Sequence, residues 1–422
     1  MRSIWGPLLN AVLFFACISA MTQAWLLPTG APYKQQQTPK EQQPNNLPSF
    51  ILPPPGFDWT RKNSQTSFAS SAVSLVPTLS QTVTLRSFLA NDDAGFALAM
   101  GPAYFGFYGY FGVLAAWDEQ VQVVATSTSS TSSSSTLSST SSPLSRITKV
   151  AGASAGAIAA VLMGSGVPPR QAADFASTLT LDQINDFPGF GGLFRGHLAE
   201  QTMHNFLVQQ MTSSKNNATT TTMSSSSLLL QHAPACPVGV SAFDLQTLQG
   251  KVLTKGNMAR AALASATFPL LFQPMGWKDA TTGEEYTLID GGIGDMAGTA
   301  ALEALESVRS KSNNDMDGEQ PPQRGGSVGE RIINLKVGAF YTKRPPGPDE
   351  IGAKQVLSIS LQNLPPVGPW ALEMGPLAVQ AAYDAMVASL DLPLYVSADQ
   401  RHYELHIDAS QFWSDPKKET TK

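Results

Sequence analysis

The stretch ITKVAGASAGAIAAVLM, residues 147–163, changes its pattern in the middle. Its first four residues predict a short buried strand, and Ala155–Met163 predicts an alanine-rich helix. Between the two, Gly152, Ser154 and Gly156 match the pattern G-x-S-x-G. Small residues at these positions let a strand turn sharply into a helix and hold the serine hydroxyl exposed at the turn. The stretch therefore predicts a strand–turn–helix unit with Ser154 as a candidate nucleophile.

A second match to the same pattern, Gly325–Gly329 with Ser327 at its centre, serves as an internal control. It follows a polar segment and leads into Ile332–Leu335, which reads as a strand rather than a helix. Because the chain contains 34 glycines, the pattern alone is weak evidence, and its context has to decide. Only Ser154 has a strand before it and a helix after it. A strand-to-helix turn without catalytic function is the alternative at that position.

The segments on either side of this unit also alternate between strand and helix patterns. This alternation predicts an α/β fold with a mostly parallel sheet flanked by helices. The predicted strands are Phe96–Met100, Ile147–Val150, Val238–Phe243, Tyr286–Ile289, Ile332–Val337 and His402–Asp408. The predicted helices are Gly112–Gln120, Ala155–Met163, Pro168–Thr178, Leu198–Met211 and Pro376–Leu390.

Composition narrows the class of partner. Of the 422 residues, 42% are apolar and only 14% are charged, and the formal net charge is −5. The chain therefore has no bulk positive field to attract phosphates, and we expect no nucleic-acid partner. The two cysteines, Cys17 and Cys236, predict neither an intrachain disulfide nor a cysteine-based zinc cluster, because Cys17 falls in a segment that we expect to be removed.

Residues 1–24 have the pattern of a signal peptide. Arg2 gives a positive start, Ile4–Ala20 is an almost unbroken apolar run, and small residues lead to a cleavage point after Ala24. We therefore expect entry into the secretory pathway or secretion. Because Trp25 follows the cleavage point, the segment also resembles the two-part signals that lead to plastids in algae. A signal anchor or a core helix is the other interpretation of the apolar run.

Low-complexity segments divide the rest of the chain, since runs of Ser, Thr, Gln and Pro cannot bury enough apolar surface to fold alone. They predict a central domain with surface insertions, bounded by linkers. The predicted parts are a disordered linker at 25–92, the domain at 93–305 with insertions at 125–146 and 212–231, a linker at 306–328, strands and a helix at 329–412 that complete the domain, and a tail at 413–422.

A serine nucleophile needs a base, and the chain offers two kinds. Asp290 follows a predicted strand and precedes Gly291 and Gly292, which allow a close approach to a neighbouring hydroxyl. A turn without a catalytic role is the alternative for this motif. The other kind is histidine: His402 and His406 come late enough for the chain order Ser, Asp, His. Both lie on one face of a predicted strand, which is also typical of a solvated surface.

Together these motifs resemble the patatin-like phospholipase family. The G-x-S-x-G match, the stretch Ala264–Pro274 and the Asp-Gly-Gly turn come in the family's order, and Gly112–Leu114 fits as well. The resemblance runs from about Phe96 to about Ala300. It implies a catalytic dyad of Ser154 and Asp290 without histidine, a parallel sheet flanked by helices, and hydrolysis of lipid acyl esters. It implies no metal or organic cofactor and a lipid or membrane-surface substrate, and it leaves the oligomeric state open.

One motif departs from the family pattern. The usual oxyanion loop is a glycine run, a variable residue, Arg and Gly, whose backbone amides face the developing negative charge. The corresponding stretch here, Met100–Gly106, has no Arg, and Pro102 has no amide hydrogen. Gly101 and Ala103 are the remaining candidate donors. A patatin-like protein that binds lipid without hydrolysing it is therefore one alternative, and an α/β-hydrolase with a Ser-Asp-His triad is another.

A lipid substrate also needs an apolar pocket for its acyl chain. Several aromatic and aliphatic residues near the predicted site are candidates for lining it, and packing in the core is the alternative role for most of them. The candidates are Phe105, Phe107, Tyr108, Tyr110, Phe111, Phe190, Leu193 and Phe194.

Overall fold

The computed structural model describes residues 83–90, 95–121, 123–124, 140–187, 191–213, 228–305, 331–338 and 347–415. They belong to one compact unit, residues 73–422. The predicted signal peptide, most of the predicted linker 25–92, the linker 306–328 and Ser327 lie outside the described residues. Within the described ranges, no helix combines the length and the apolar character needed to cross a membrane.

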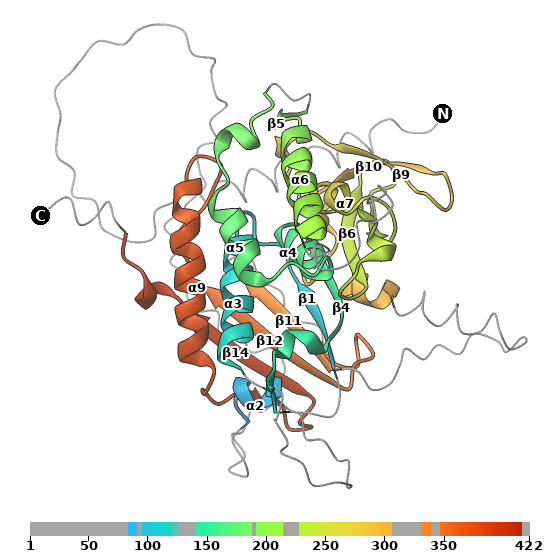
Figure 1. The fold of residues 1–422 in the computed structure, drawn as a ribbon. Helices are drawn as coiled ribbons and strands as arrows, with labels where there is room; N and C mark the ends of the chain where they lie inside the picture. The colour runs from blue at the N-terminus through green and yellow to red at the C-terminus, as the bar shows by residue number, and fades with distance from the viewer. Residues whose placement is uncertain are drawn as a thin grey trace, which may run out of the picture. The chain divides into compact units, whose positions relative to one another are not determined.

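A ten-stranded sheet forms the centre of this unit, in the order β13-β14-β12-β11-β1-β4-β6-β10-β9, with β7 also paired to β6 (Figure 1). The strands from β14 to β6 in this order run parallel, whereas β13, β7, β10 and β9 are antiparallel to their neighbours. Their bounds are β1 Phe96–Met100, β4 Ile147–Ala153, β6 Val238–Asp244, β7 Gln249–Leu253, β9 Met275–Lys278, β10 Glu285–Ile289, β11 Arg331–Val337, β12 Gln355–Gln362, β13 Tyr395–Val396 and β14 His402–Asp408.

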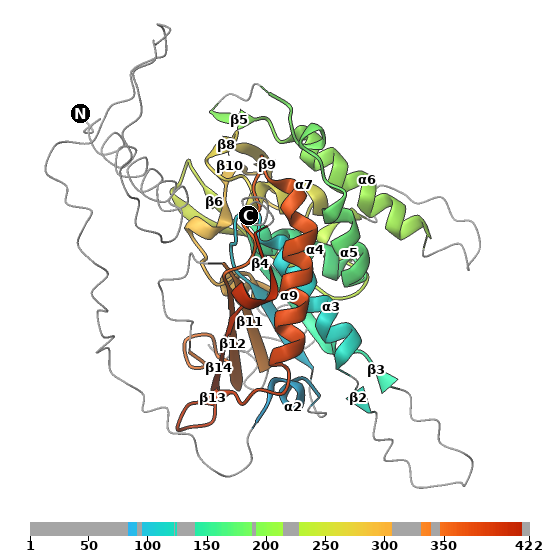
Figure 2. The ribbon, with the colours of Figure 1, turned by 90° about the vertical axis from the view of Figure 1, so that its left-hand side faces the viewer.

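Helices cover the sheet, and the predicted α/β fold with a mostly parallel sheet is confirmed. Figure 2 shows α3, α4 and α9 stacked along one face of the sheet. The helices are α2 Leu85–Ala90, α3 Phe107–Gln120, α4 Ala155–Gly164, α5 Pro169–Ser177, α6 His197–Ser213, α7 Met258–Ser265 and α9 Gly375–Ser389. Two short strand pairs, β2 Val123–Val124 with β3 Thr140–Ser141 and β5 Gly192–Phe194 with β8 Leu270–Phe272, lie outside the main sheet.

The central strands are apolar because both of their faces are covered. All five residues of β1 are buried, which is typical of a strand inside a parallel sheet. Helix α3 begins at Phe107, five residues before the predicted start at Gly112, because its aromatic first turn is buried in the same core. The two helices α3 and α9 pack side by side above the sheet.

Three predicted boundaries need correction. The predicted linker 25–92 ends too late, because its last part forms α2, whose Leu85 and Leu89 are fully buried. The predicted insertion 125–146 ends in β3 and a short 3-10 helix at Pro143–Arg146, which packs against the core through its buried proline. In the predicted insertion 212–231, residues 228–231 belong to the folded domain, because Leu228 and Leu230 are buried in its core. Apolar side chains at the ends of these segments extend the fold into stretches that composition alone assigns to linkers.

Candidate active site

Ser154 lies at the sharp turn between β4 and α4, with φ 55° and ψ −125°. This conformation is strained for a residue with a side chain. The flanking glycines make the turn possible: a Cβ on Gly152 would lie 2.1 Å from the Gly156 carbonyl oxygen, and one on Gly156 would lie 2.2 Å from the Met100 carbonyl oxygen. The G-x-S-x-G motif therefore forms the predicted strand–turn–helix unit.

The Asp-Gly-Gly turn brings Asp290 onto Ser154. The Ser154 hydroxyl donates to Asp290 Oδ2 at 2.6 Å, and the amide of Gly292 donates to Asp290 Oδ1 at 2.8 Å. Asp290 follows β10 and begins a 3-10 helix at Gly291, where a Cβ would lie 1.9 Å from the Ser241 carbonyl oxygen. Both oxygens of the carboxylate are thus fixed, and no larger residue fits at Gly291.

The environment of Asp290 changes its acidity. Burial raises the pKa of its carboxyl to about 6, although the hydrogen bonds from Ser154 and Gly292 act in the opposite direction. An aspartate with this pKa takes up a proton more readily than an exposed one, and it remains ionised near neutral pH. A desolvated carboxylate in contact with a serine hydroxyl is a suitable general base.

The stretch Ala264–Pro274 connects the two halves of the site. Ser265 accepts the amide hydrogen of Ser154 at 2.7 Å and donates its own hydroxyl to the Ser241 carbonyl at 2.6 Å. The carbonyl of Thr267 accepts the amide hydrogen of Asp290 at 3.0 Å. The sequence analysis gives these two residues no role, although they lie in the stretch Ala264–Pro274 that resembles the patatin-like family. They position both members of the Ser154–Asp290 pair.

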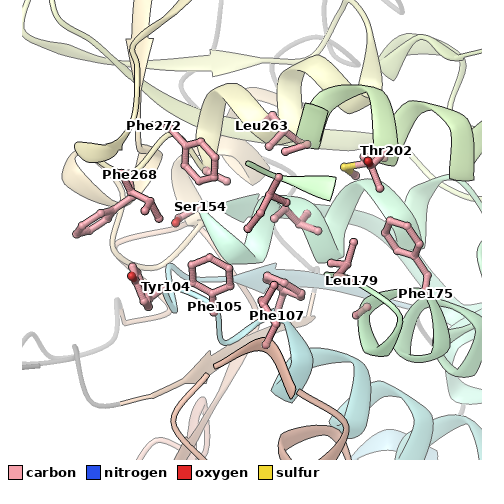
Figure 3. Close-up of a pocket in the computed structure, with 18 of the residues that line it drawn as sticks. Tyr104, Phe105, Phe107, Ser154, Phe175, Leu179, Thr202, Leu263, Phe268 and Phe272 are labelled. Atoms are coloured by element: carbon pink, nitrogen blue, oxygen red, sulfur yellow. The ribbon is translucent and has the colours of Figure 1, made fainter. Parts of the chain in front are cut away.

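An apolar pocket opens beside Ser154 (Figure 3). Ser154 lies toward one end of it, near Tyr104 and Phe268, and Phe175 and Thr202 lie at the other. Apart from Ser154, Tyr104 and Thr202, every lining side chain is apolar. The lining residues are Tyr104, Phe105, Phe107, Phe111, Ser154, Ile158, Leu162, Phe175, Ala176, Leu179, Ile184, Ala199, Thr202, Met203, Leu263, Ala266, Phe268, Leu271, Phe272 and Leu372.

Comparison with known families agrees with this geometry, since residues 106–302 match the model of patatin-like phospholipases. This segment is a patatin-like phospholipase domain. Among solved structures, VipD from Legionella pneumophila matches with 13% identity and a TM-score of 0.39, over 71% of this chain and 67% of that one. ExoU, in its complex with SpcU from Pseudomonas aeruginosa, matches with 13% identity and a TM-score of 0.34, over 70% of this chain and 52% of that one. No curated protein matches the sequence.

Only some of the residues predicted to line an apolar pocket do so in the patatin-like domain. Phe105, Phe107 and Phe111 do so. Tyr108 and Tyr110 are instead fully buried in the core, and Leu193 and Phe194 belong to an apolar cluster with Leu271 and Phe272. Phe190 lies outside the described residues. The pocket extends away from these residues, between α5 and α6, which the aromatic run in the sequence could not indicate.

The oxyanion prediction for Gly101 is wrong. Its amide continues the sheet and donates to the Leu335 carbonyl at 3.3 Å, and its carbonyl accepts the Tyr110 hydroxyl at 2.7 Å. Ala103 is buried, and no group in the described ranges accepts its amide hydrogen. The amide of Ala155 lies next to Ser154 at the start of α4, where a helix has no internal acceptors for its first amides. Ala103 therefore remains a candidate donor, and Ala155 is a second one.

The two histidines of the alternative triad lie far from Ser154. They are on β14, and β12, β11 and β1 separate this strand from β4. Four strand spacings correspond to about 19 Å. The His402 ring contacts Ser358, and the His406 ring contacts Ser360 at 2.7 Å, so both point to neighbouring residues of their own sheet region. An α/β-hydrolase triad that uses His402 or His406 is therefore inconsistent with the fold.

Proposed function

We propose that the protein is a lipid acyl hydrolase that cleaves fatty-acyl esters of phospholipids or related glycerolipids with a dyad of Ser154 and Asp290. One observation carries this proposal: the 2.6 Å hydrogen bond from the Ser154 hydroxyl to the buried Asp290 carboxylate, in the wall of an apolar pocket. The patatin-like phospholipase domain supports a lipid ester as the substrate.

In the proposed reaction, Ser154 Oγ attacks the ester carbonyl carbon while Asp290 Oδ2 takes the hydroxyl proton. The tetrahedral intermediate collapses, the proton passes from Asp290 to the leaving alcohol oxygen, and the acyl group stays on Ser154. Asp290 then accepts a proton from water as that water attacks the acyl-enzyme. Release of the fatty acid returns the proton to Ser154 Oγ, so the enzyme is regenerated without any other reactant.

The negative charge on the carbonyl oxygen needs donors near Ser154. The amide of Ala155 and the positive end of α4 lie directly behind the nucleophile, and Ala103 is the second candidate donor. Removing a single oxyanion donor typically costs about 100- to 1000-fold in rate. Ala155 and Ala103 together would compensate for the amide that Gly101 uses in the sheet.

The apolar pocket is suited to the acyl chain. It begins at Ser154 and continues between α5 and α6, where Thr202 is the one polar side chain of the lining, so most of its length offers no hydrogen bonds. A headgroup would remain outside. Cleavage at the ester next to the bound chain follows from this arrangement.

A panel of phospholipids, galactolipids and triacylglycerols, with released fatty acid as the readout, tests the function. We expect release from at least one class, loss of release with Ser154→Ala and Asp290→Asn, and full release with the control variant Ser327→Ala. Lipid binding by the parent protein without any release of fatty acid would favour the non-catalytic alternative. Release that survives in Ser154→Ala would refute the dyad.

We also propose that residues 1–24 direct the chain into the secretory pathway, on the basis of the apolar run and the small residues that follow it. Sequencing the N-terminus of the mature protein tests this. A new N-terminus at Trp25 is the expected result, and an intact Met1 in purified native protein would contradict it.

A further inference from the structure

Exposed apolar side chains gather on the segments that border the pocket. In the described part of the chain, eight large apolar side chains are exposed. Three of these, Phe187, Leu270 and Trp370, lie within three residues of a pocket-lining residue and are 65%, 51% and 69% exposed. Single exposed apolar residues are common on soluble proteins, but a group of them beside an apolar pocket indicates a contact surface. We call these three residues the apolar rim.

The fold brings the three segments to the edge of the sheet at which Ser154 lies. Trp370 is in the loop after β12, which runs parallel to β4, so this loop leaves the sheet at the same carboxyl edge as Ser154. Leu270 is the first residue of β8, and this strand pairs with β5 shortly after Phe187. Figure 2 shows β5 and β8 at one end of the fold and β13 at the other.

The backbone is constrained at or next to two members of the rim, Phe187 and Leu270. The carboxylate of Asp186, next to Phe187, accepts the amide hydrogens of four successive residues, Arg195 to Leu198, at the start of α6. Leu270 has a φ of 71°, a left-handed conformation that is unfavourable for leucine. A strained backbone that keeps an apolar side chain in solvent points to a function for that exposure.

The charges around the rim limit the kind of lipid surface that it can contact. The segments that carry the rim residues also carry the acids Asp182, Asp186 and Glu373 and one base, Arg195. A surface of this composition attracts no anionic headgroups. Contact with a membrane would therefore depend on insertion of the three apolar side chains between headgroups, with a contribution that grows with the apolar area buried.

We propose that the apolar rim docks this protein onto a lipid surface without net charge, such as a phosphatidylcholine bilayer, with the pocket mouth facing the lipid. A substrate chain could then pass from the bilayer into the pocket without crossing water. This proposal rests on the proposed function in one respect, because it takes the lipid of the surface to be the substrate as well. Docking itself does not require hydrolysis.

The experiment uses the full chain with Ser154→Ala, so that vesicles are not consumed. Sedimentation with phosphatidylcholine vesicles measures the bound fraction at low and high salt. The rim variant combines Phe187→Ser, Leu270→Asn and Trp370→Ser. The matched control combines Leu392→Asn and Tyr395→Ser, which replace side chains 46% and 58% exposed at the opposite end, in and next to β13.

We expect binding by the parent that salt does not weaken, a loss of about tenfold or more in vesicle affinity for the rim variant, and no change for the control. When the three rim substitutions are made in the chain that keeps Ser154, this variant should hydrolyse a soluble short-chain ester as fast as the unsubstituted protein does. Such activity would show that the rim variant folds. Equal binding by the rim variant, equal loss in the control, or binding abolished by salt would overturn the proposal. So would a change of oligomeric state in the rim variant alone, because the surface would then join two copies of the chain. Absence of ester hydrolysis in the parent would count against the proposed function and leave the vesicle result to decide docking.

Discussion

In the proposed reaction Asp290 is the base, and the raised pKa of its carboxyl leads to a pH dependence of the rate. Because burial raises the pKa of its carboxyl to about 6, it is protonated, and cannot accept the Ser154 proton, in an increasing fraction of molecules as the pH falls. We expect kcat/KM for a soluble ester to fall about tenfold per pH unit below about pH 6 and to be level from there to neutral pH. A profile that stays level down to about pH 4 would contradict the assignment of Asp290.

The same shift affects stability with the opposite sign. A carboxyl whose pKa is higher in the folded than in the unfolded state contributes stability below the unfolded value, and this contribution is lost as the pH rises through about 6. Asp290→Asn has no such loss. The melting temperature of Asp290→Asn, relative to that of the parent, should therefore rise by a few degrees as the pH increases from about 4 to about 7. Thermal unfolding at several pH values measures the difference.

We expect Ser265 to act as a positioning residue for Ser154. Its hydroxyl is fully buried and holds the amide of Ser154, so Ser265→Ala should lower kcat about 10- to 100-fold with little change in KM, because the nucleophile loses its fixed position. Ser389→Ala is the matched control: it removes another buried serine hydroxyl that donates to a backbone carbonyl, in α9. Both variants should lose about 1 kcal/mol of stability. Equal kcat in both would show that Ser265 has only a structural role.

At this scale the sequence indicates that Ser154 and Asp290 belong to one site, but it does not indicate the contacts around them. Ser154 and Asp290 can be found because each belongs to a short local motif with glycines at fixed positions. The bond from Ser154 to Ser265 joins residues 111 positions apart, and no local pattern contains it. Gly101 was misassigned for the same reason, since its amide is used by Leu335 on a neighbouring strand.

Among the elements, α5 and α6 define the far end of the pocket. Phe175 of α5 stacks on Phe206 of α6, with ring centroids 4.0 Å apart and planes 10° apart, and Phe175 lines the pocket. Phe175→Ala should lengthen the pocket and move the preferred substrate to longer acyl chains, by about fourfold in kcat/KM for each additional buried methylene.

A series of esters with increasing acyl length measures this preference. Phe88→Ala is the control, because Phe88 is buried against Tyr403 and contributes to stability without lining the pocket. An unchanged optimum in Phe175→Ala would mean that the acyl chain does not reach α5.

The insertion between α3 and β4 is the opposite case. Its Ser- and Thr-rich part, 126–139, lies between two strands that pair with each other, β2 and β3, so a shorter turn can replace it. Loop closure changes by only about 0.6 kcal/mol per doubling of length. We expect a variant with this run replaced by a short Gly-Ser turn to keep its melting temperature and its turnover. Loss of activity in a folded variant would give the insertion a role in the site.

Most of the longer strands could be predicted from the sequence, with β12 as the exception, whereas the shortest strands could not. The strands β1, β4, β6, β11 and β14 each contain the segment predicted for them, because their apolar runs are long enough to show a period. The strands β5, β8 and β13 have two or three residues, too few for any period. In β12, Ser358 interrupts the apolar pattern although it is buried, and its hydroxyl finds a partner in His402 on β14. Because His402 lies on the neighbouring strand, the sequence of β12 alone does not show that Ser358 has this partner.

At the scale of the whole molecule, the parallel sheet brings together residues that are distant in the chain. Ser154, Asp290 and the loop before α9 meet at one edge of the sheet, and the pocket takes side chains from Tyr104 to Leu372. The α/β class follows from the alternation of elements, but the pocket depends on how six separate segments pack. From the sequence we could predict only some of the aromatic residues that line it.

The most direct test of the dyad is to find which serine reacts with a reagent that modifies serine nucleophiles. The full chain is treated with a fluorophosphonate that carries an alkyl chain, and the modified peptide is identified by mass spectrometry. We expect one adduct, on Ser154, absent in Ser154→Ala, formed much more slowly in Asp290→Asn and unchanged in Ser327→Ala. An adduct on another serine, or labelling of Ser154 at the same rate without Asp290, would contradict the Ser154–Asp290 dyad.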